Sequence, residues 1–143
     1  QLISESANKD LVFNYEGNLL SIQLGRTFTR EEEYSLFIDY TAKPNERTVG
    51  GSSAITQDKG LYFINPLNED PEKPQQIWTQ GETESNSAWF PTIDKPNERC
   101  TQEIKVTVQE RVETLSNSTL KSSTDNSEGK RTEDYLMEKP HAP

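Results

Sequence analysis

Gln80 and Glu82 are the residues whose types and spacing best suit the binding of a small cation. They flank Gly81 in a segment, residues 76–82, that is expected to be extended. Alternate residues of a strand point to the same face about 7 Å apart, so an amide oxygen and a carboxylate can converge on one ammonium group. Gly81, on the opposite face, would allow another backbone or a ligand to approach closely. The same geometry also describes a solvated strand end, and both interpretations stay open here.

The segment that follows has the composition of a rigid corner. Trp89 and Phe90 precede Pro91, and Asp94 stands two residues before Pro96. The aromatic side chains should bury and anchor the segment, while each proline restricts the residue before it to extended or turn conformations. Asp94 is expected to accept backbone N–H groups in an Asx-type turn. We therefore interpret these five residues as a structural turn that holds the polar pair in place.

The sequence offers little for catalysis. The single histidine, His141, lies two residues from the end and suits a strand end or a linker better than a ligand, and the single cysteine is Cys100. A His- and Cys-based zinc site cannot be built from these, and a nucleophile would have only His141 as its base. Glu82 and Glu84 could form a glycosidase-like pair, but in a chain with 24 acidic residues such a pair is usually surface. We expect no catalytic residue, metal site or cofactor within these residues.

Length and charge narrow the class of protein. A chain of 143 residues corresponds to about one domain, and its 30% hydrophobic content predicts a thin core between sheet layers. The formal net charge of −9 argues against a nucleic-acid partner, which would require a basic surface. No apolar run approaches the length of a membrane span, and a lone cysteine cannot form an intrachain disulfide. Without an initiating Met, the chain is expected to be a piece of a longer protein, so its location stays open.

Short strand-like runs separated by turns dominate the chain. The candidates are residues 11–15, 19–24, 34–40, 61–64, 76–79 and 104–109. The first two flank Glu16-Gly17-Asn18 and predict a hairpin, and the last alternates apolar and polar residues as a strand with one wet face does. Residues 49–59, 65–75 and 121–130 have the composition of solvated loops. Because no stretch has an apolar stripe of period 3.6, the fold class predicted is all-β.

Two of these segments together resemble a known family. QIWTQGE at residues 76–82 and WFPTIDKP at residues 89–96 are similar to the Q-x-E…F-P-x-x-D-x-P signature in the N-terminal domain of M1-family zinc aminopeptidases. The later parts of the chain follow the order seen in that family: a strand at 101–108, a hairpin at 114–117, the sequence GKRT at 129–132, Met137, and PHAP at 140–143. The resemblance covers residues 59–143, while residues 1–58 contribute only compatible strands.

The resemblance implies a fold and a partner. Residues 1–143 would form a single saddle-like β-sandwich of mostly antiparallel strands, truncated at its N-terminus. A thermolysin-like catalytic domain of the same chain would begin after Pro143 and carry the zinc ligands and the catalytic residues. The fragment alone is therefore expected to be inactive and free of zinc, although the parent would be a zinc metallo-aminopeptidase.

The resemblance also assigns roles to the polar pair. Glu82 matches the family acid that holds the free α-amino group of a peptide substrate, and Gln80 matches the glutamine two residues before it. Fixing that ammonium group at a set distance from the nucleophile lets only the first peptide bond react. The alternative is a non-enzymatic β-sandwich binding or adhesion module, whose aromatic residues could line a carbohydrate platform. A stand-alone hydrolase with two carboxylates is a third hypothesis, and a His-Glu-x-x-His sequence beyond Pro143 would favour the peptidase.

Overall fold

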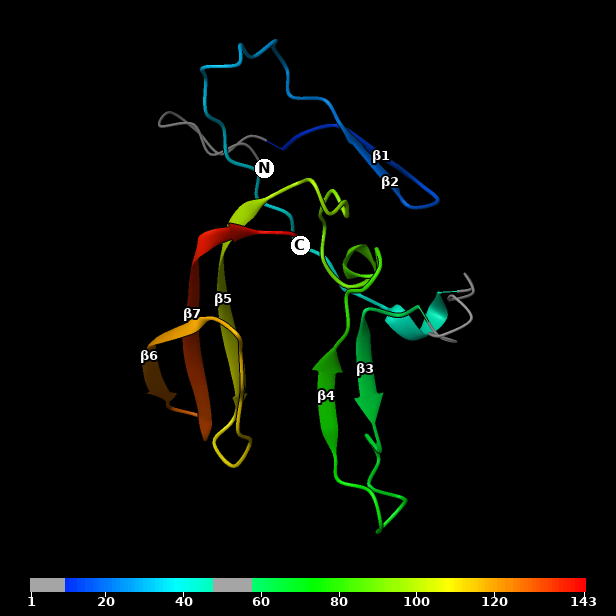
Figure 1. Ribbon diagram of the computed structural model, residues 1–143, viewed down its shortest axis with the longest axis vertical. Helices are drawn as coiled ribbons and strands as arrows, with labels where there is room; N and C mark the ends of the chain where they lie inside the picture. Colours follow the sequence, from blue (N-terminus) through cyan, green and yellow to red (C-terminus); the bar gives the residue numbers. More distant parts are fainter. Residues whose placement is uncertain (1–9, 48–57) are drawn as a thin grey trace. The chain divides into compact units, whose positions relative to one another are not determined.

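The computed structural model describes residues 10–47 and 58–143 and divides the chain into two compact units, Gln1–Thr41 and Ala42–Pro143 (Figure 1). Within the described residues, seven strands form three separate antiparallel sheets, and the helical content is limited to two single-turn 3-10 helices. The predicted all-β class with antiparallel strands is confirmed. The loop expected at residues 49–59 lies almost wholly outside the described residues.

The described residues of the first unit include the hairpin that the sequence predicted. Strand β1 (Phe13–Glu16) pairs with β2 (Leu19–Ile22) through a two-residue turn of Gly17 and Asn18. Gly17 has a φ of 58°, the left-handed conformation that the first residue of a type II′ turn requires and that glycine adopts at least cost. The backbone N–H of Gln23 donates to the carbonyl of Val12 at 2.9 Å, which extends the pairing beyond the strands.

The strand predicted over residues 34–40 is wrong. Only Leu36 takes part in an isolated bridge, and the rest of this segment is irregular. A run of aromatic and β-branched residues makes a segment compatible with a sheet, but this composition does not specify the backbone pairing that a strand requires. Just before this segment, a hydrogen bond from the N–H of Glu32 to the carbonyl of Thr29 at 3.3 Å closes a turn.

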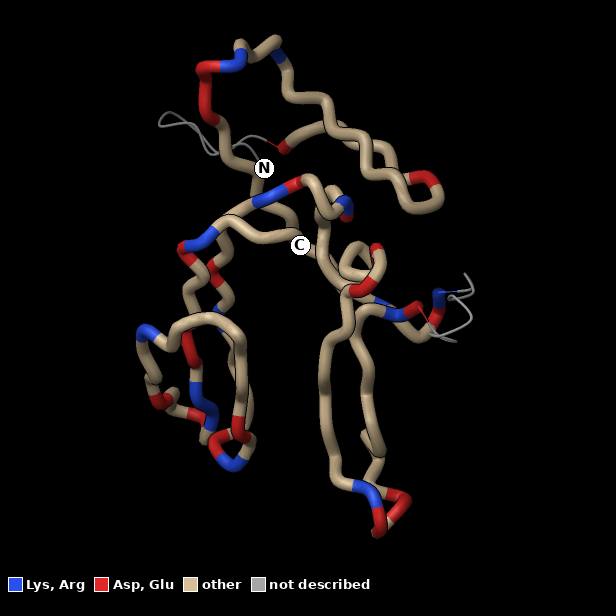
Figure 2. Tube along the Cα trace, in the orientation of Figure 1, with Lys and Arg blue, Asp and Glu red and all other residues tan. Residues whose placement is uncertain are grey.

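The second unit begins with the 3-10 helix η1 (Pro44–Glu46) and a two-stranded sheet. Strand β3 (Leu61–Ile64) pairs antiparallel with β4 (Gln76–Thr79), as the sequence predicted. Tyr62 lies opposite Trp78, and their rings stack with centroids 4.4 Å apart. Figure 2 shows that neither strand carries a charged residue and that charges gather at the turn between them.

That turn, residues 65–75, is the solvated loop predicted. Asn65 has a φ of 46°, a left-handed conformation that asparagine tolerates better than most residues. Its side-chain nitrogen donates to the carbonyls of Asp70 at 2.8 Å and Lys73 at 2.7 Å, and its side-chain oxygen accepts the N–H of Asp70 at 3.1 Å. These side-chain bonds add to the backbone bonds of the same turn, in which the N–H of Asn68 donates to Asn65 and the N–H of Lys73 donates to Asp70.

The largest sheet is built from three longer strands. β7 (Lys130–His141) lies between β5 (Cys100–Gln109) and β6 (Thr119–Asn126), and both neighbours run antiparallel to it (Figure 1). Burial alternates along most of β5, so the predicted strand with one wet face is confirmed. The loop predicted at residues 121–130 is wrong, because most of it belongs to β6. Its polar residues are all exposed, and pairing with β7 compensates for their weak strand propensity.

The core is thin, as the composition predicted. Among the described residues, Tyr135 on β7 is the one large apolar side chain that counts as buried, with 6% of its surface exposed. Its hydroxyl donates to the carboxylate of Glu133 at 2.9 Å and lies 2.7 Å from the hydroxyl of Thr114, which also bonds to Glu133. Arg131 forms an ion pair with Glu133 at 2.8 Å. This polar cluster fastens the connection between β5 and β6 to the central strand.

Arg131 adds a second attachment for the same connection. Its guanidinium group donates to the carbonyl oxygens of Glu110 at 3.2 Å and Val112 at 2.9 Å.

Elsewhere in the second unit, the Cys100 thiol is free and exposed. No helix found in residues 10–47 and 58–143 has the length and apolar character needed to cross a membrane.

Candidate functional site

Gln80 lies at the end of β4, where the strand pairing continues for one more residue. Its backbone N–H donates to the carbonyl of Gly60 at 3.0 Å, one position beyond the pair formed by Leu61 and Thr79. Gly60 is buried, whereas the Gln80 side chain is half-buried. The start of the candidate site is therefore fixed by the edge of a regular sheet.

Glu82 is not part of that strand. The extended conformation predicted for residues 76–82 ends at Thr79, and Glu82 begins a turn, closed by a hydrogen bond from the N–H of Ser85 to the carbonyl of Gly81 at 2.9 Å. The side-chain oxygen of Gln80 accepts the backbone N–H of Glu82 at 3.5 Å. The predicted sharing of one strand face is thus wrong, because the chain turns directly after Gln80. This local hydrogen bond instead places the Gln80 side chain beside the backbone of Glu82.

The Glu82 carboxylate is exposed. It makes no hydrogen bond or ion pair with any residue in the part of the chain that the structure describes. The neighbouring acid Glu84 differs, because its carboxylate forms an ion pair with Lys95 at 2.7 Å. These are the two carboxylates considered above as a glycosidase-like pair. The charge of Glu84 is balanced by Lys95, whereas the carboxylate of Glu82 is available to a ligand.

The turn that carries Glu82 rests on buried polar residues. Ser85 is 1% exposed, and its hydroxyl donates to the carbonyl of Glu82 at 3.4 Å. Its own carbonyl oxygen lies so close to Gly60 that a β-carbon at position 60 would be 2.0 Å from it. Gly60 also has a φ of 69°, so both its conformation and its contact require glycine. Gly60 therefore holds the strand edge and the turn against each other.

Asn86 is the centre of this arrangement. Its side-chain nitrogen donates to the carbonyl oxygen of Pro143 at 2.6 Å, and its side-chain oxygen accepts the indole N–H of Trp89 at 3.2 Å. A β-carbon on Gly81 would come within 2.0 Å of the Asn86 side-chain nitrogen. Ser85 and Asn86 were not among the residues predicted from the sequence. The one signal for them in the sequence was Gly81. A close approach of another group to Gly81 was predicted, but the sequence did not indicate that this group would be the Asn86 side chain.

Asp94 is attached to the same turn. Its carboxylate accepts the backbone N–H of Ser87 at 2.7 Å, within the 3-10 helix η2 (Asn86–Ala88). Asp94 thus fills the predicted acceptor role, but its donor lies seven positions earlier and is not a neighbour in a local Asx turn. The bond satisfies an N–H group in the first turn of η2, where backbone N–H groups lack partners within the helix.

The other residues of the predicted structural turn have local contacts. The rings of Trp89 and Phe90 meet edge to face with centroids 4.6 Å apart, and both side chains are half-buried. The N–H of Glu98 donates to the carbonyl of Lys95 at 3.0 Å, which closes a turn with Pro96 at its second position. Proline suits that position because its φ is already set. Pro91 is exposed.

A metal centre is not evident in this arrangement. The described residues contain no group of three or more His, Cys, Asp or Glu side chains placed to hold a metal ion. His141 ends β7 opposite Cys100, and its Nδ1 lies 2.5 Å from the carbonyl of Ala142. These residues do not fit a zinc site, so no chemistry is assigned to a metal here.

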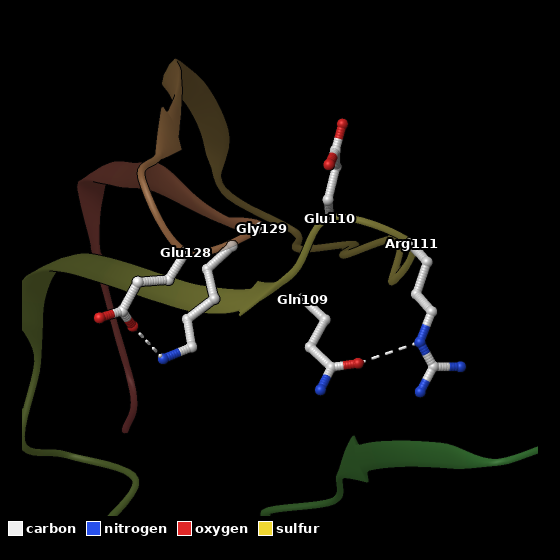
Figure 3. A pocket seen from close by; sticks show the side chains of 6 residues that line it. Gln109, Glu110, Arg111, Glu128 and Gly129 are labelled. Atoms are coloured by element: carbon white, nitrogen blue, oxygen red, sulfur yellow. Dashed lines mark hydrogen bonds and ion pairs between the residues drawn. The ribbon is translucent and has the colours of Figure 1, made fainter.

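One open hollow of about 580 Å³ lies where β5 ends and β7 begins (Figure 3). Its lining residues are Gln109, Glu110, Arg111, Glu128, Gly129 and Lys130. Three of its charged side chains already have partners among the lining residues: Lys130 pairs with Glu128 at 3.0 Å, and Arg111 donates to Gln109 at 3.0 Å. None of the predicted site residues lines it.

The fold and the site together define an all-β domain that presents an exposed carboxylate on a turn braced by buried polar contacts. The family model of the peptidase M1 N-terminal domain matches residues 2–142 of the chain, so the chain belongs to this family. It is the N-terminal domain of an M1 peptidase, which favours the peptidase hypothesis over an adhesion module. Searches among curated proteins and among solved structures found no match.

Proposed function

We propose that this chain is the N-terminal domain of a zinc-dependent aminopeptidase and that Glu82, with Gln80 beside it, binds the α-ammonium group of the peptide substrate. The observation that supports this most directly is the state of the Glu82 carboxylate: exposed, and without a partner among the described residues. Glu84, two positions later, is paired with Lys95 and is a poorer candidate.

The chemistry follows from the residue types. A carboxylate and an amide oxygen both accept hydrogen bonds from an ammonium group, and the carboxylate adds the attraction of opposite charges. A hydrogen bond to a charged group is worth about 1.5–3 kcal/mol, enough to select substrates with a free N-terminus. An ammonium group fixed in this way presents the first peptide bond to the catalytic groups, so the enzyme would release single residues.

The catalytic partner is proposed as a second domain of the same chain. It would be thermolysin-like, begin after Pro143 and hold the zinc ion, which supplies the activation of water for peptide hydrolysis when bound. In this division the N-terminal domain positions the substrate, and by itself it has no hydrolytic activity. The family membership supports this division, since the family is defined as the N-terminal domain of a peptidase.

The proposal is tested by steady-state kinetics of the enzyme that carries this domain, with an aminoacyl 4-nitroanilide as substrate. Glu82→Gln keeps the size of the side chain and removes its charge, so KM should rise roughly tenfold to a hundredfold with a smaller change in kcat. Glu84→Gln is the matched control and should leave KM near the wild-type value. Wild-type kinetics in Glu82→Gln would refute the assignment.

A further inference from the structure

We infer that Asn86 is a positioning residue for Glu82: it connects the turn that carries this acid to the segment that follows β7. The inference rests on the proposed function of Glu82 and names a residue that would set its position. Three contacts support it, and all of them meet at one side-chain amide. They are the hydrogen bond to Pro143, the hydrogen bond from Trp89 and the close contact with Gly81.

The contact with Gly81 gives Asn86 its influence on the site. Gly81 is bonded directly to both Gln80 and Glu82, and there is no room between it and Asn86 for even a methyl group. A displacement of the Asn86 side chain must therefore move the backbone of Gly81 or open a gap beside it. In the first case the direction in which Glu82 leaves the turn changes, and in the second case Asn86 no longer holds that direction.

The hydrogen bond to Pro143 connects two segments that are far apart in the sequence. Asn86 and Pro143 are 57 positions apart in sequence, and the N–H···O distance of 2.6 Å is short for an amide donor. Pro143 lies two residues beyond the end of β7 at His141. Asn86 thus ties the Glu82 turn to the segment through which the proposed catalytic domain would be attached.

Trp89 fixes the orientation of the amide. An asparagine side chain can be turned over so that its nitrogen and oxygen exchange places, but here the indole N–H can only donate. It must face the Asn86 oxygen, so the nitrogen is left to face Pro143. Because Asn86 as a residue is 9% exposed, both bonds are also partly shielded from competing water.

The test compares three variants in the enzyme that carries this domain, again with an aminoacyl 4-nitroanilide. Asn86→Asp keeps the shape and the acceptor for Trp89 but loses the donor to Pro143, and Asn86→Ala loses both. Asn97→Asp adds the same charge in an exposed turn and is the control. For Asn86→Asp, KM should rise about threefold to tenfold while kcat per active site changes less than about twofold, because substrate placement alone is affected.

A double variant separates positioning from a merely structural role. If Asn86 acts through Glu82, adding Asn86→Asp to Glu82→Gln should raise KM little beyond Glu82→Gln alone. The inference about Asn86 is overturned if the two substitutions multiply their effects on KM. It is also overturned if KM stays at the wild-type value in Asn86→Asp while it is raised in Glu82→Gln. In both cases the role of Glu82 still stands. A wild-type KM in Glu82→Gln would instead refute the proposed function. If Asn86→Ala does not fold, Asn86→Asp still tests the inference, because it keeps the shape of the side chain.

Discussion

Gly81 and Asn86 are packed so closely that a β-carbon on Gly81 would lie 2.0 Å from the Asn86 side-chain nitrogen. Gly81 is therefore required by contact, since its φ lies outside the left-handed region in which Gly60 is found. The polar pair of Gln80 and Glu82 is separated by a residue that cannot carry a side chain. The shape of the site therefore depends on the missing side chain at Gly81 as much as on the two hydrogen-bond acceptors, Gln80 and Glu82.

Gly81→Ala should destabilise the chain by about 1–3 kcal/mol, because the added methyl group must displace the Asn86 amide. The cost should fall by about 0.5–3 kcal/mol in an Asn86→Ala background, where the space is free. Urea unfolding of the four chains, wild type, two single variants and the double, measures this coupling. Strictly additive effects of the two substitutions would mean that the two residues do not meet.

Much of this fold could be predicted from the sequence, because most strands follow from local patterns of residues. The alternation along residues 104–109 and the Gly17 turn both depend on neighbouring residues, and both predictions are confirmed. The prediction failed where long-range pairing decides. Residues 34–40 have the composition of a strand but form none in the part of the chain that the structure describes, whereas β6 has a loop-like composition and pairs with β7.

The candidate site shows the same division. Gln80 and Glu82 could be named from their types and spacing, and Gly81 indicated a close approach. Asn86 could not be predicted, because its partners include Pro143, 57 positions away, and nothing in the local sequence announces such a contact. The roles of Gln80 and Glu82 themselves stay predictions.

Breaking the partly buried ion pair of Glu133 with Arg131 should cost more stability than breaking the exposed pair of Glu103 with Lys105 on the same sheet. Glu133→Ala leaves Arg131 without its carboxylate and removes the acceptor for Tyr135 and Thr114, so it should cost about 3 kcal/mol. Glu103→Ala should cost less than about 1 kcal/mol, because solvent screens that pair.

Denaturant unfolding with both variants measures this difference. Amide hydrogen exchange gives a local readout, since Glu133→Ala should speed exchange in the β5–β6 connection that the cluster fastens. Equal stability losses in the two variants would show that the cluster around Tyr135 adds nothing beyond an ordinary surface pair.

In the first unit, the pKa of Glu32 lies below its ordinary value, mainly because its carboxylate accepts the backbone N–H of Thr29 and also because it pairs with Arg26. A lowered pKa stabilises the folded state above pH 4.5, and this contribution is lost as the pH falls through the folded value. Arg26→Met should raise the pKa of Glu32 only part of the way, because the bond from Thr29 remains.

Carbon-13 NMR of the Glu32 carboxyl group across an acid titration measures this shift. Arg30→Met is the control, since it removes a nearby charge without removing the ion pair. An unchanged pKa in Arg26→Met would contradict the ion pair, and a complete return to the ordinary value would contradict the contribution from Thr29.

The most direct test of the central claim uses two competitive inhibitors that differ only in the presence of an α-amino group. Their affinities are measured for the enzyme that carries this domain and for its Glu82→Gln variant. If Glu82 binds the ammonium group, the variant should lose roughly tenfold to a hundredfold in affinity for the amino compound and nothing for the compound without it. Equal changes for the two inhibitors, or none for the amino compound, would contradict the claim.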